Sequence, residues 1–143
     1  MKMQLSIGMA VSVFLSAFAA AADEWPSKPI RWVCPYVAGG AADIFSRTIG
    51  QKLGEVFGQT VIIDNRPGAN GSIGTELVAH SQPDGYTVLM GQSGPLTVNP
   101  NFYRKLGYDT LKDFAPVTQG TLYMYVLVVQ ASNPISNIKN MIT

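Results

Sequence analysis

The chain has 143 residues, which is enough for one modest domain. Its 10 Lys and Arg residues nearly balance its 9 Asp and Glu residues, and the basic residues form no cluster. This dispersed, near-neutral charge argues against nucleic acid and against an anionic membrane surface as binding partners.

The first 22 residues have the pattern of a cleavable secretory signal. Lys2 is the only early charge, residues 5–22 are apolar or small, and Ala20-Ala21-Ala22 fits the small-x-small cleavage rule. Ala17-Phe18-Ala19 offers a second cleavage site. The stretch nears membrane-spanning length, so an uncleaved anchor is the alternative. Its Ala-rich end and the lack of a basic flank favour cleavage, and we therefore expect an exported protein.

Strand-like and helix-like stretches alternate through the next part of the chain. The order of strand, helix, strand, helix and strand, with short connections, predicts an α/β fold with a parallel sheet and helices on its faces. Within the first helix an apolar stripe is expected from Phe45, Ile49, Leu53 and Val56. The expected elements are strands over residues 30–35, 60–64 and 86–90 and helices over residues 42–57 and 72–81.

From residue 96 onward the pattern changes. Residues 96–113 have the composition of a loop, and residues 114–118 are expected to form a short strand. A strongly apolar strand is expected over residues 122–130. Asn133-Pro134 then precedes a helix that is expected from Ile135 onward.

A candidate anion site lies where the first helix begins. The carboxyl ends of parallel strands share one edge of a sheet, and ligands collect there. Three loops are expected at this edge, over residues 36–42, 65–71 and 91–95. The first of them contains Ala38-Gly39-Gly40-Ala41-Ala42-Asp43, whose small side chains leave the first amide groups of the helix bare for an anion. The alternative is a tight turn, and for Asp43 itself a capping role is favoured over ligand contact.

The remaining motifs carry no catalytic signature. Gly68, Gly71 and Gly74 lack the spacing of a dinucleotide fingerprint and are better explained by turns and helix packing. Pro95 stands where a nucleophile elbow around Ser93 needs glycine, so Ser93 is only a candidate hydroxyl donor to a ligand. We expect no catalytic residue, metal or cofactor. His80 is expected at the surface, and an exposed loop position is favoured for Arg66 over contact with an anion. The single cysteine, Cys34, is interpreted as a buried strand residue rather than a reactive thiol.

Several ordered blocks of the chain, from Trp25 to its end, resemble the tripartite tricarboxylate transporter receptors, also called Bug receptors. Because the blocks agree together and in order, the resemblance is specific. The blocks are Trp25-Pro26-x-Lys28-Pro29-Ile30, Pro35-Tyr36, Gly39-Gly40-x-x-Asp43, Asn65-Arg66-Pro67-Gly68-Ala69, Gly71-x-Ile73-Gly74, Pro83-Asp84-Gly85-Tyr86-Thr87, Asn99-Pro100 and Lys112-Asp113-Phe114-Ala115-Pro116.

The resemblance implies a monomeric periplasmic solute-binding protein that captures an organic carboxylate and delivers it to the membrane permease subunits of a transporter. It implies two α/β lobes of the type II periplasmic-binding-protein kind around a cleft. Val37 and Cys34 depart from the family's usual Pro and Val. The ligand-binding residues that it implies are Tyr36, Ala38, Gly39, Gly40, Ala41, Ala42, Asp43, Gln92, Ser93 and Gly94.

Family members are about twice as long as this chain, as a protein of two lobes is. We therefore expect a signal peptide over residues 1–22, a first α/β lobe over residues 23–121, and the start of a crossing into a largely missing second lobe over residues 122–143. Two alternatives remain open. The chain is a truncated receptor without function, or it is a small secreted α/β hydrolase.

Overall fold

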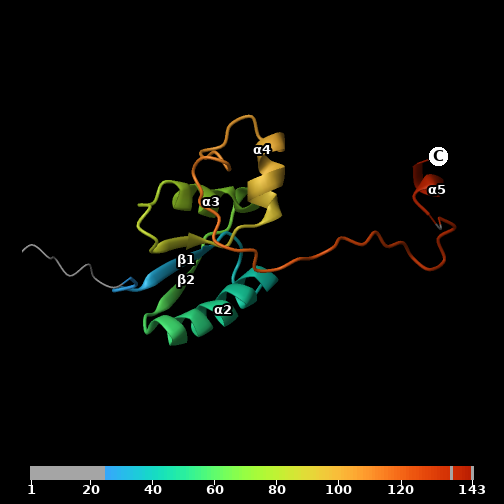
Figure 1. Cartoon of the computed structure of the whole chain (residues 1–143). Coiled ribbons are helices and arrows are strands. Elements are labelled where there is room, and N and C mark those ends of the chain that lie inside the picture. Colours follow the sequence, from blue (N-terminus) through green and yellow to red (C-terminus); the bar gives the residue numbers. More distant parts are fainter. Residues whose placement is uncertain (1–24, 136, 143) are drawn as a thin grey trace, which may run out of the picture.

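A computed structural model describes residues 25–135 and 137–142, so the expected signal peptide lies outside the described residues. At its centre is a three-stranded parallel sheet in the order β2-β1-β3 (Figure 1). Ile30 pairs with Val61 on one side of β1, and Arg31 pairs with Thr87 on the other. This arrangement confirms the predicted α/β fold with a parallel sheet. The strands are β1 (Ile30–Cys34), β2 (Val61–Asn65) and β3 (Thr87–Leu89).

Two helices cover the sheet from opposite sides. The helix α2 (Ala41–Phe57) packs against β1 and β2, and the helix α3 (Ser72–Ala79) packs against β1 and β3 (Figure 1). The middle strand β1 is therefore covered on both faces, which explains why its sequence shows little polar alternation. Val33 and Cys34 are fully buried, so the interpretation of Cys34 as a buried strand residue is confirmed.

The face that α2 turns to the sheet is not the predicted apolar stripe. Ser46 and Gly50 are buried, whereas Ile49 is 36% exposed and Val56 is 77% exposed. A Cβ atom on Gly50 would lie 3.0 Å from the side chain of Ile63. The helix thus approaches β2 closely enough that only small residues fit between them, and the bulky residues of the predicted stripe lie partly in solvent.

The helix α3 follows a 3-10 turn, η2 (Ala69–Gly71), and approaches β1 just as closely. A Cβ atom on Gly74 would lie 2.8 Å from the carbonyl oxygen of Arg66 and 3.0 Å from the Cα atom of Pro35. Gly68 and Gly71 have φ angles of 126° and 86°, which side chains rarely tolerate. The interpretation of these glycines as turn and packing residues is confirmed. His80 follows α3 and is exposed, as predicted.

The expected loop over residues 96–113 is partly helical, so that prediction is wrong. A π-helical turn, η3 (Gly94–Val98), leads directly into the short helix α4 (Asn99–Phe102). Proline occupies the first turn of both elements, where its missing N–H group costs no helical hydrogen bond. The buried Tyr108 donates a hydrogen bond of 2.6 Å to the carbonyl oxygen of Pro95, which fixes the following loop against η3.

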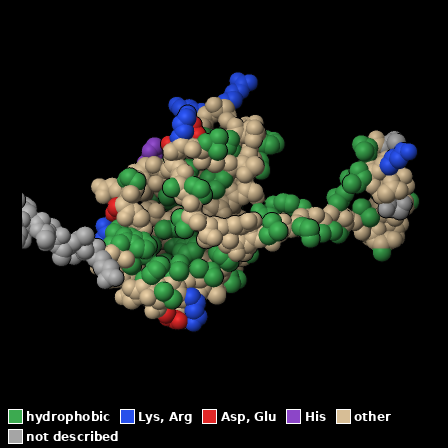
Figure 2. Space-filling view, viewed as in Figure 1, with side chains coloured by type: hydrophobic (Ala, Val, Ile, Leu, Met, Phe, Trp, Pro, Cys, Tyr) green, Lys and Arg blue, Asp and Glu red, His purple; other side chains and the backbone are tan. Residues whose placement is uncertain are grey.

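The strands expected over residues 114–118 and 122–130 do not form. Residues 115–130 are extended, and their exposure ranges from 45% at Val129 to 89% at Met124 within residues 122–129. A strand exists only when a neighbour pairs with its backbone, and no described residue pairs with this segment. Figure 1 shows the segment crossing the lobe beside α2 and then leaving it, and Figure 2 shows hydrophobic side chains along it.

The predicted C-terminal helix starts later than expected, as α5 (Lys139–Ile142). Over residues 25–135 and 137–142, no helix combines the length and the apolar character needed to cross a bilayer.

Candidate functional site

The start of α2 presents unpaired backbone amides at the carboxyl edge of the sheet. Gly39 turns the chain with a φ angle of 82°, and Gly40 then forms the N-cap without any side-chain hydrogen bond. Within the described residues, the amide groups of Ala41 and Ala42 have no acceptor. Because α2 has 17 residues, its dipole adds to the attraction of these amides for an anion.

Asp43 anchors the loop that precedes these amides. Its side chain is buried, with 3% of the residue exposed. The carboxylate accepts hydrogen bonds from the Gly39 amide at 2.8 Å, from Arg47 Nε at 3.0 Å and from Asn65 Nδ2 at 3.0 Å. The Arg47 guanidinium, followed by the Gly39 amide, lowers the pKa of Asp43 to about 2. The charge of Asp43 is thus matched by Arg47, and its oxygens bond to the protein itself.

Asn65 joins the loop after β1 to the loop after β2. Its side-chain amide also donates a hydrogen bond of 3.1 Å to the carbonyl oxygen of Tyr36, and its Oδ1 accepts one of 3.1 Å from Arg47. Asn65 was not among the predicted site residues. Its place at the end of β2, on the edge shared by the three loops, was the available signal.

The hydroxyl group of Tyr36 lies where the loops after β1, β2 and β3 meet. A Cβ atom on Gly94 would lie 2.8 Å from the Tyr36 hydroxyl oxygen and 3.2 Å from the side-chain nitrogen of Asn70. Burial, together with the nearby Tyr123, raises the pKa of Tyr36. The Tyr36 hydroxyl therefore stays protonated at neutral pH, and it has no hydrogen-bond partner among the described residues.

Ser93, after β3, contacts the extended segment that crosses the lobe. Its Oγ atom lies 2.8 Å from the hydroxyl oxygen of Tyr123, and the ring of Tyr123 packs edge-on against Tyr125. The carbonyl oxygen of Gln92 accepts a hydrogen bond of 3.1 Å from the Leu96 amide, which joins Gln92 to the start of η3. The hydroxyl groups of Ser93 and Tyr123 thus lie at the same edge of the sheet as Tyr36.

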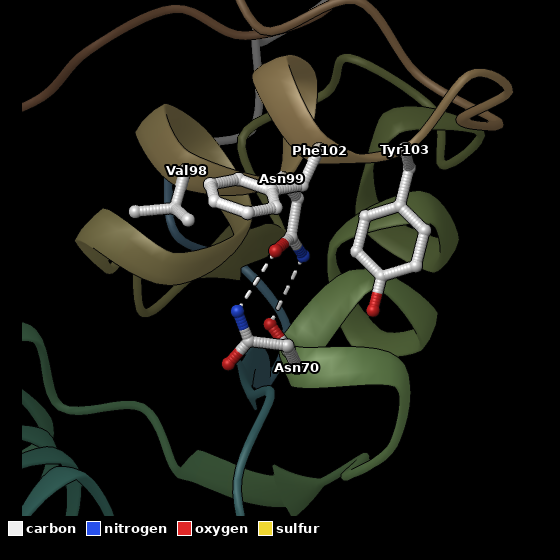
Figure 3. A pocket seen from close by; sticks show the side chains of 5 residues that line it. All are labelled: Asn70, Val98, Asn99, Phe102 and Tyr103. Atoms are coloured by element: carbon white, nitrogen blue, oxygen red, sulfur yellow. Dashed lines mark hydrogen bonds between the residues drawn. The ribbon is translucent and has the colours of Figure 1, made fainter.

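Asn70 and Asn99 form a second polar pair at this edge. The Asn70 Nδ2 atom donates a hydrogen bond of 2.8 Å to Asn99 Oδ1, and Asn99 Nδ2 donates one of 3.2 Å to the carbonyl oxygen of Asn70 (Figure 3). Asn99 is buried, whereas Asn70 is exposed. A hollow of about 370 Å³ surrounds the pair, and it is lined by Asn70, Val98, Asn99, Phe102 and Tyr103.

The comparison with known proteins identifies the family. The profile described as "Tripartite tricarboxylate transporter family receptor" matches residues 45–143. The chain is also 41% identical over 132 residues to a UPF0065 protein of Bordetella bronchiseptica. The chain belongs to the tripartite tricarboxylate transporter receptor family. It spans 39% of the length of that relative, while the matched region covers 92% of the chain itself.

Solved structures of similar proteins have the same lobe. MatC from Rhodopseudomonas palustris, solved with bound malate, superposes with a TM-score of 0.62 at 34% identity, covering 65% of this chain and 32% of MatC. A second Rhodopseudomonas palustris protein, solved with adipate, superposes with a TM-score of 0.60 at 39% identity, covering 62% of this chain and 29% of the other. The three-stranded sheet and its helices therefore form an α/β lobe of the kind found in periplasmic binding proteins.

In this member of the receptor family, the predicted site residues fall into two groups. Tyr36, Ser93 and Gly94 meet at one edge of the sheet, beside Asn70, which the sequence analysis did not select. The loop from Ala38 to Ala42 lies at the start of α2 and offers backbone amides. Asp43 stabilises that loop by accepting a hydrogen bond from the Gly39 amide. Arg66 forms an ion pair with Asp64 at 2.8 Å. Among the described residues, no group of three or more His, Cys, Asp and Glu is arranged to hold a metal ion.

Proposed function

We propose that the chain captures an organic carboxylate in the periplasm, as the ligand-binding part of a receptor for a tripartite tricarboxylate-type transporter. The observation that carries this proposal is the pair of bare amides, Ala41 and Ala42, at the start of a 17-residue helix. A carboxylate oxygen accepts hydrogen bonds from such amides and is further stabilised by the helix dipole.

The surroundings of the amides suit capture rather than chemistry. Gly40 carries no side chain that would cover the helix start, and Asp43 is neutralised by Arg47 beneath the loop. The hydroxyl groups of Tyr36 and Ser93 are the next donors along the same edge of the sheet. We therefore propose no catalytic role for these residues, and the protein's partners are a small carboxylate and the permease subunits of the transporter.

The relatives support the class of ligand and the domain plan. One similar structure was solved with malate and another with adipate, and both ligands are dicarboxylic acids. Because the chain spans 39% of the length of its relative from Bordetella bronchiseptica, we propose that a second lobe faces this site in the complete receptor. Residues 122–143 would then lead into that lobe, and closure of the lobes around the ligand would signal to the permease.

A specific alternative is that the chain does not bind a ligand when no second lobe is present. Eight consecutive apolar residues, 122–129, are exposed in an extended conformation, and an apolar segment of this kind promotes aggregation. A chain that aggregates before it binds any acid would favour this alternative.

Isothermal titration with succinate, malate, citrate, glutamate and aromatic carboxylates tests the proposal. The Gly40→Val variant should bind the best of these acids at least ~10 times more weakly, because its side chain covers the bare amides. A Cβ atom on Gly40 lies 3.5 Å from the Val37 carbonyl oxygen, an ordinary contact, so the variant should still fold. The matched control is Thr48→Val, which replaces a hydroxyl group by a methyl group on an exposed part of α2 and removes the bond from Thr48 Oγ1 to the Ile44 carbonyl oxygen. Equal affinity in Gly40→Val and Thr48→Val would remove the helix start from the site.

A further inference from the structure

We infer that Asn70 is a specificity-determining residue of the proposed carboxylate site, and that it favours acids carrying a hydroxyl group over equally long acids without one. The inference rests on the proposed function, since it concerns the same edge of the sheet. It follows from how Asn99 orients Asn70, and from what lies beside the oriented amide.

Asn99 fixes the orientation of the Asn70 side-chain amide, so that Asn70 Nδ2 faces Asn99. The Asn99 Nδ2 atom is already used, because it donates hydrogen bonds to Ser72 Oγ at 2.8 Å and to the carbonyl oxygen of Asn70 at 3.2 Å. Asn99 therefore presents only its Oδ1 atom, which accepts the hydrogen bond from Asn70 Nδ2. The Oδ1 atom of Asn70 then points away from Asn99, as Figure 3 shows, and it is left as an acceptor.

This acceptor lies beside a donor. The side-chain oxygen of Asn70 and the hydroxyl oxygen of Tyr36 both lie within 3.3 Å of the position of a Cβ atom built on Gly94. The Tyr36 hydroxyl has no partner among the described residues. A ligand hydroxyl both donates and accepts, so it matches this pair, whereas a second carboxylate only accepts and cannot bond to Asn70 Oδ1.

The hollow on the Asn99 side of Asn70 adds few competing partners. Val98 and Phe102 contribute apolar walls next to Asn70, and Tyr103 contributes its ring and its hydroxyl group (Figure 3). Val98 and Phe102 offer the Asn70 oxygen no donor that could replace a ligand hydroxyl. An acid that displaces water from this oxygen without replacing the lost hydrogen bond is penalised, and an acid that donates to it is not.

The backbone around Asn70 allows a clean variant. Asn70 has a φ angle of 50°, in the left-handed region that Gly and Asp also tolerate. Asn70→Gly keeps this conformation and removes the acceptor, together with the hydrogen bond from Asn70 Nδ2 to Asn99 Oδ1. Asn70→Asp keeps an acceptor oxygen at the edge but adds a negative charge. Asn101→Gly is the matched control, because Asn101 is exposed and its side chain bonds only to the carbonyl oxygen of Thr97.

The experiment is calorimetric titration of the full chain with succinate and with each enantiomer of malate, which differ from succinate by one hydroxyl group. The wild type and Asn101→Gly should bind one malate enantiomer with roughly 3- to 10-fold higher affinity than succinate. Asn70→Gly should lose this preference, because its affinity for malate should fall more than its affinity for succinate. Asn70→Asp should keep the preference but bind both acids more weakly, most clearly at low salt.

Three other results would overturn the inference. A wild type that binds malate and succinate equally, or an Asn70→Gly variant that keeps the preference, would overturn the inference and leave the proposed function standing. An Asn70→Asp variant with unchanged affinities would also overturn it, because the added charge would then lie away from the ligand. If the wild type binds none of the carboxylates, the proposed function fails and this inference fails with it.

Discussion

The side-chain carboxylate of Asp43 accepts a hydrogen bond of 2.8 Å from the backbone amide of Gly39, which precedes it by four residues. This bond closes the turn before α2 on itself, and Asn65 and Arg47 hold the same carboxylate from β2 and α2. The loop that carries the bare amides is therefore fixed before any ligand arrives. A fixed loop binds more tightly, since no conformational entropy is lost when the ligand is captured.

Acid should weaken the protein through Asp43. Its pKa is lowered from the ordinary value of 3.8 to about 2 in the folded chain. A lowered folded-state pKa stabilises the fold above the unfolded-state value, and this contribution is lost as the pH falls from about 4 towards 2. Urea unfolding at a series of pH values should show this loss in the wild type.

The control for this pH dependence is Asp43→Asn, which should be less stable at neutral pH and should lose less stability between pH 4 and pH 2. If the variant and the wild type follow parallel curves over this range, the ionised carboxylate of Asp43 does not hold the loop.

The space around two glycines predicts very different costs when each is replaced by alanine. Gly74→Ala places a Cβ atom 2.8 Å from the Arg66 carbonyl oxygen, so backbone must shift, and we expect a loss of roughly 1–3 kcal/mol in the free energy of unfolding. Gly40→Ala meets only the Val37 carbonyl oxygen at 3.5 Å, and we expect a change within roughly 0.5 kcal/mol. Chemical denaturation measures both, and similar losses would contradict the close packing of α3 on β1.

Asn99 should matter for stability as well as for the ligand site. The buried amide bonds to Ser72, to Asn70 and to the carbonyl oxygen of Ala69, so Asn99→Ala leaves several polar groups without partners. We expect a loss of roughly 2–4 kcal/mol in the free energy of unfolding. Asn101→Ala, on the exposed side of α4, should change it by less than roughly 0.5 kcal/mol. Equal effects of the two substitutions would show that the Asn99 bonds contribute no net stability.

The alternating core of the lobe could be predicted from the sequence, because each strand and helix has a local signal. The apolar run of β1 and the glycine that follows α2 set their bounds to within about one residue of those observed. The packing face of α2 could not be predicted in this way. It depends on the distance between α2 and β2, which makes Gly50 a contact residue and leaves Val56 exposed.

The candidate site likewise has some residues with a local sequence signal and others that only the tertiary fold brings together. The glycine-rich start of α2 is a local feature, so the sequence indicated the residues from Ala38 to Ala42. The pairing of Asn70 with Asn99 joins residues 29 positions apart and has no local signal. The strand expected over residues 122–130 failed for a related reason, because β-propensity does not supply a neighbouring strand.

The central claim is that this lobe binds a carboxylate, and a thermal melt of the purified chain with and without the panel of acids tests it most directly. An acid present at ~100 times its dissociation constant should stabilise the folded chain by ~2.7 kcal/mol. We expect a cooperative melt that at least one acid shifts upward in the wild type and shifts far less in Gly40→Val. A cooperative melt that no acid shifts would contradict carboxylate binding by this lobe, and the absence of any cooperative melt would contradict an independently folded lobe.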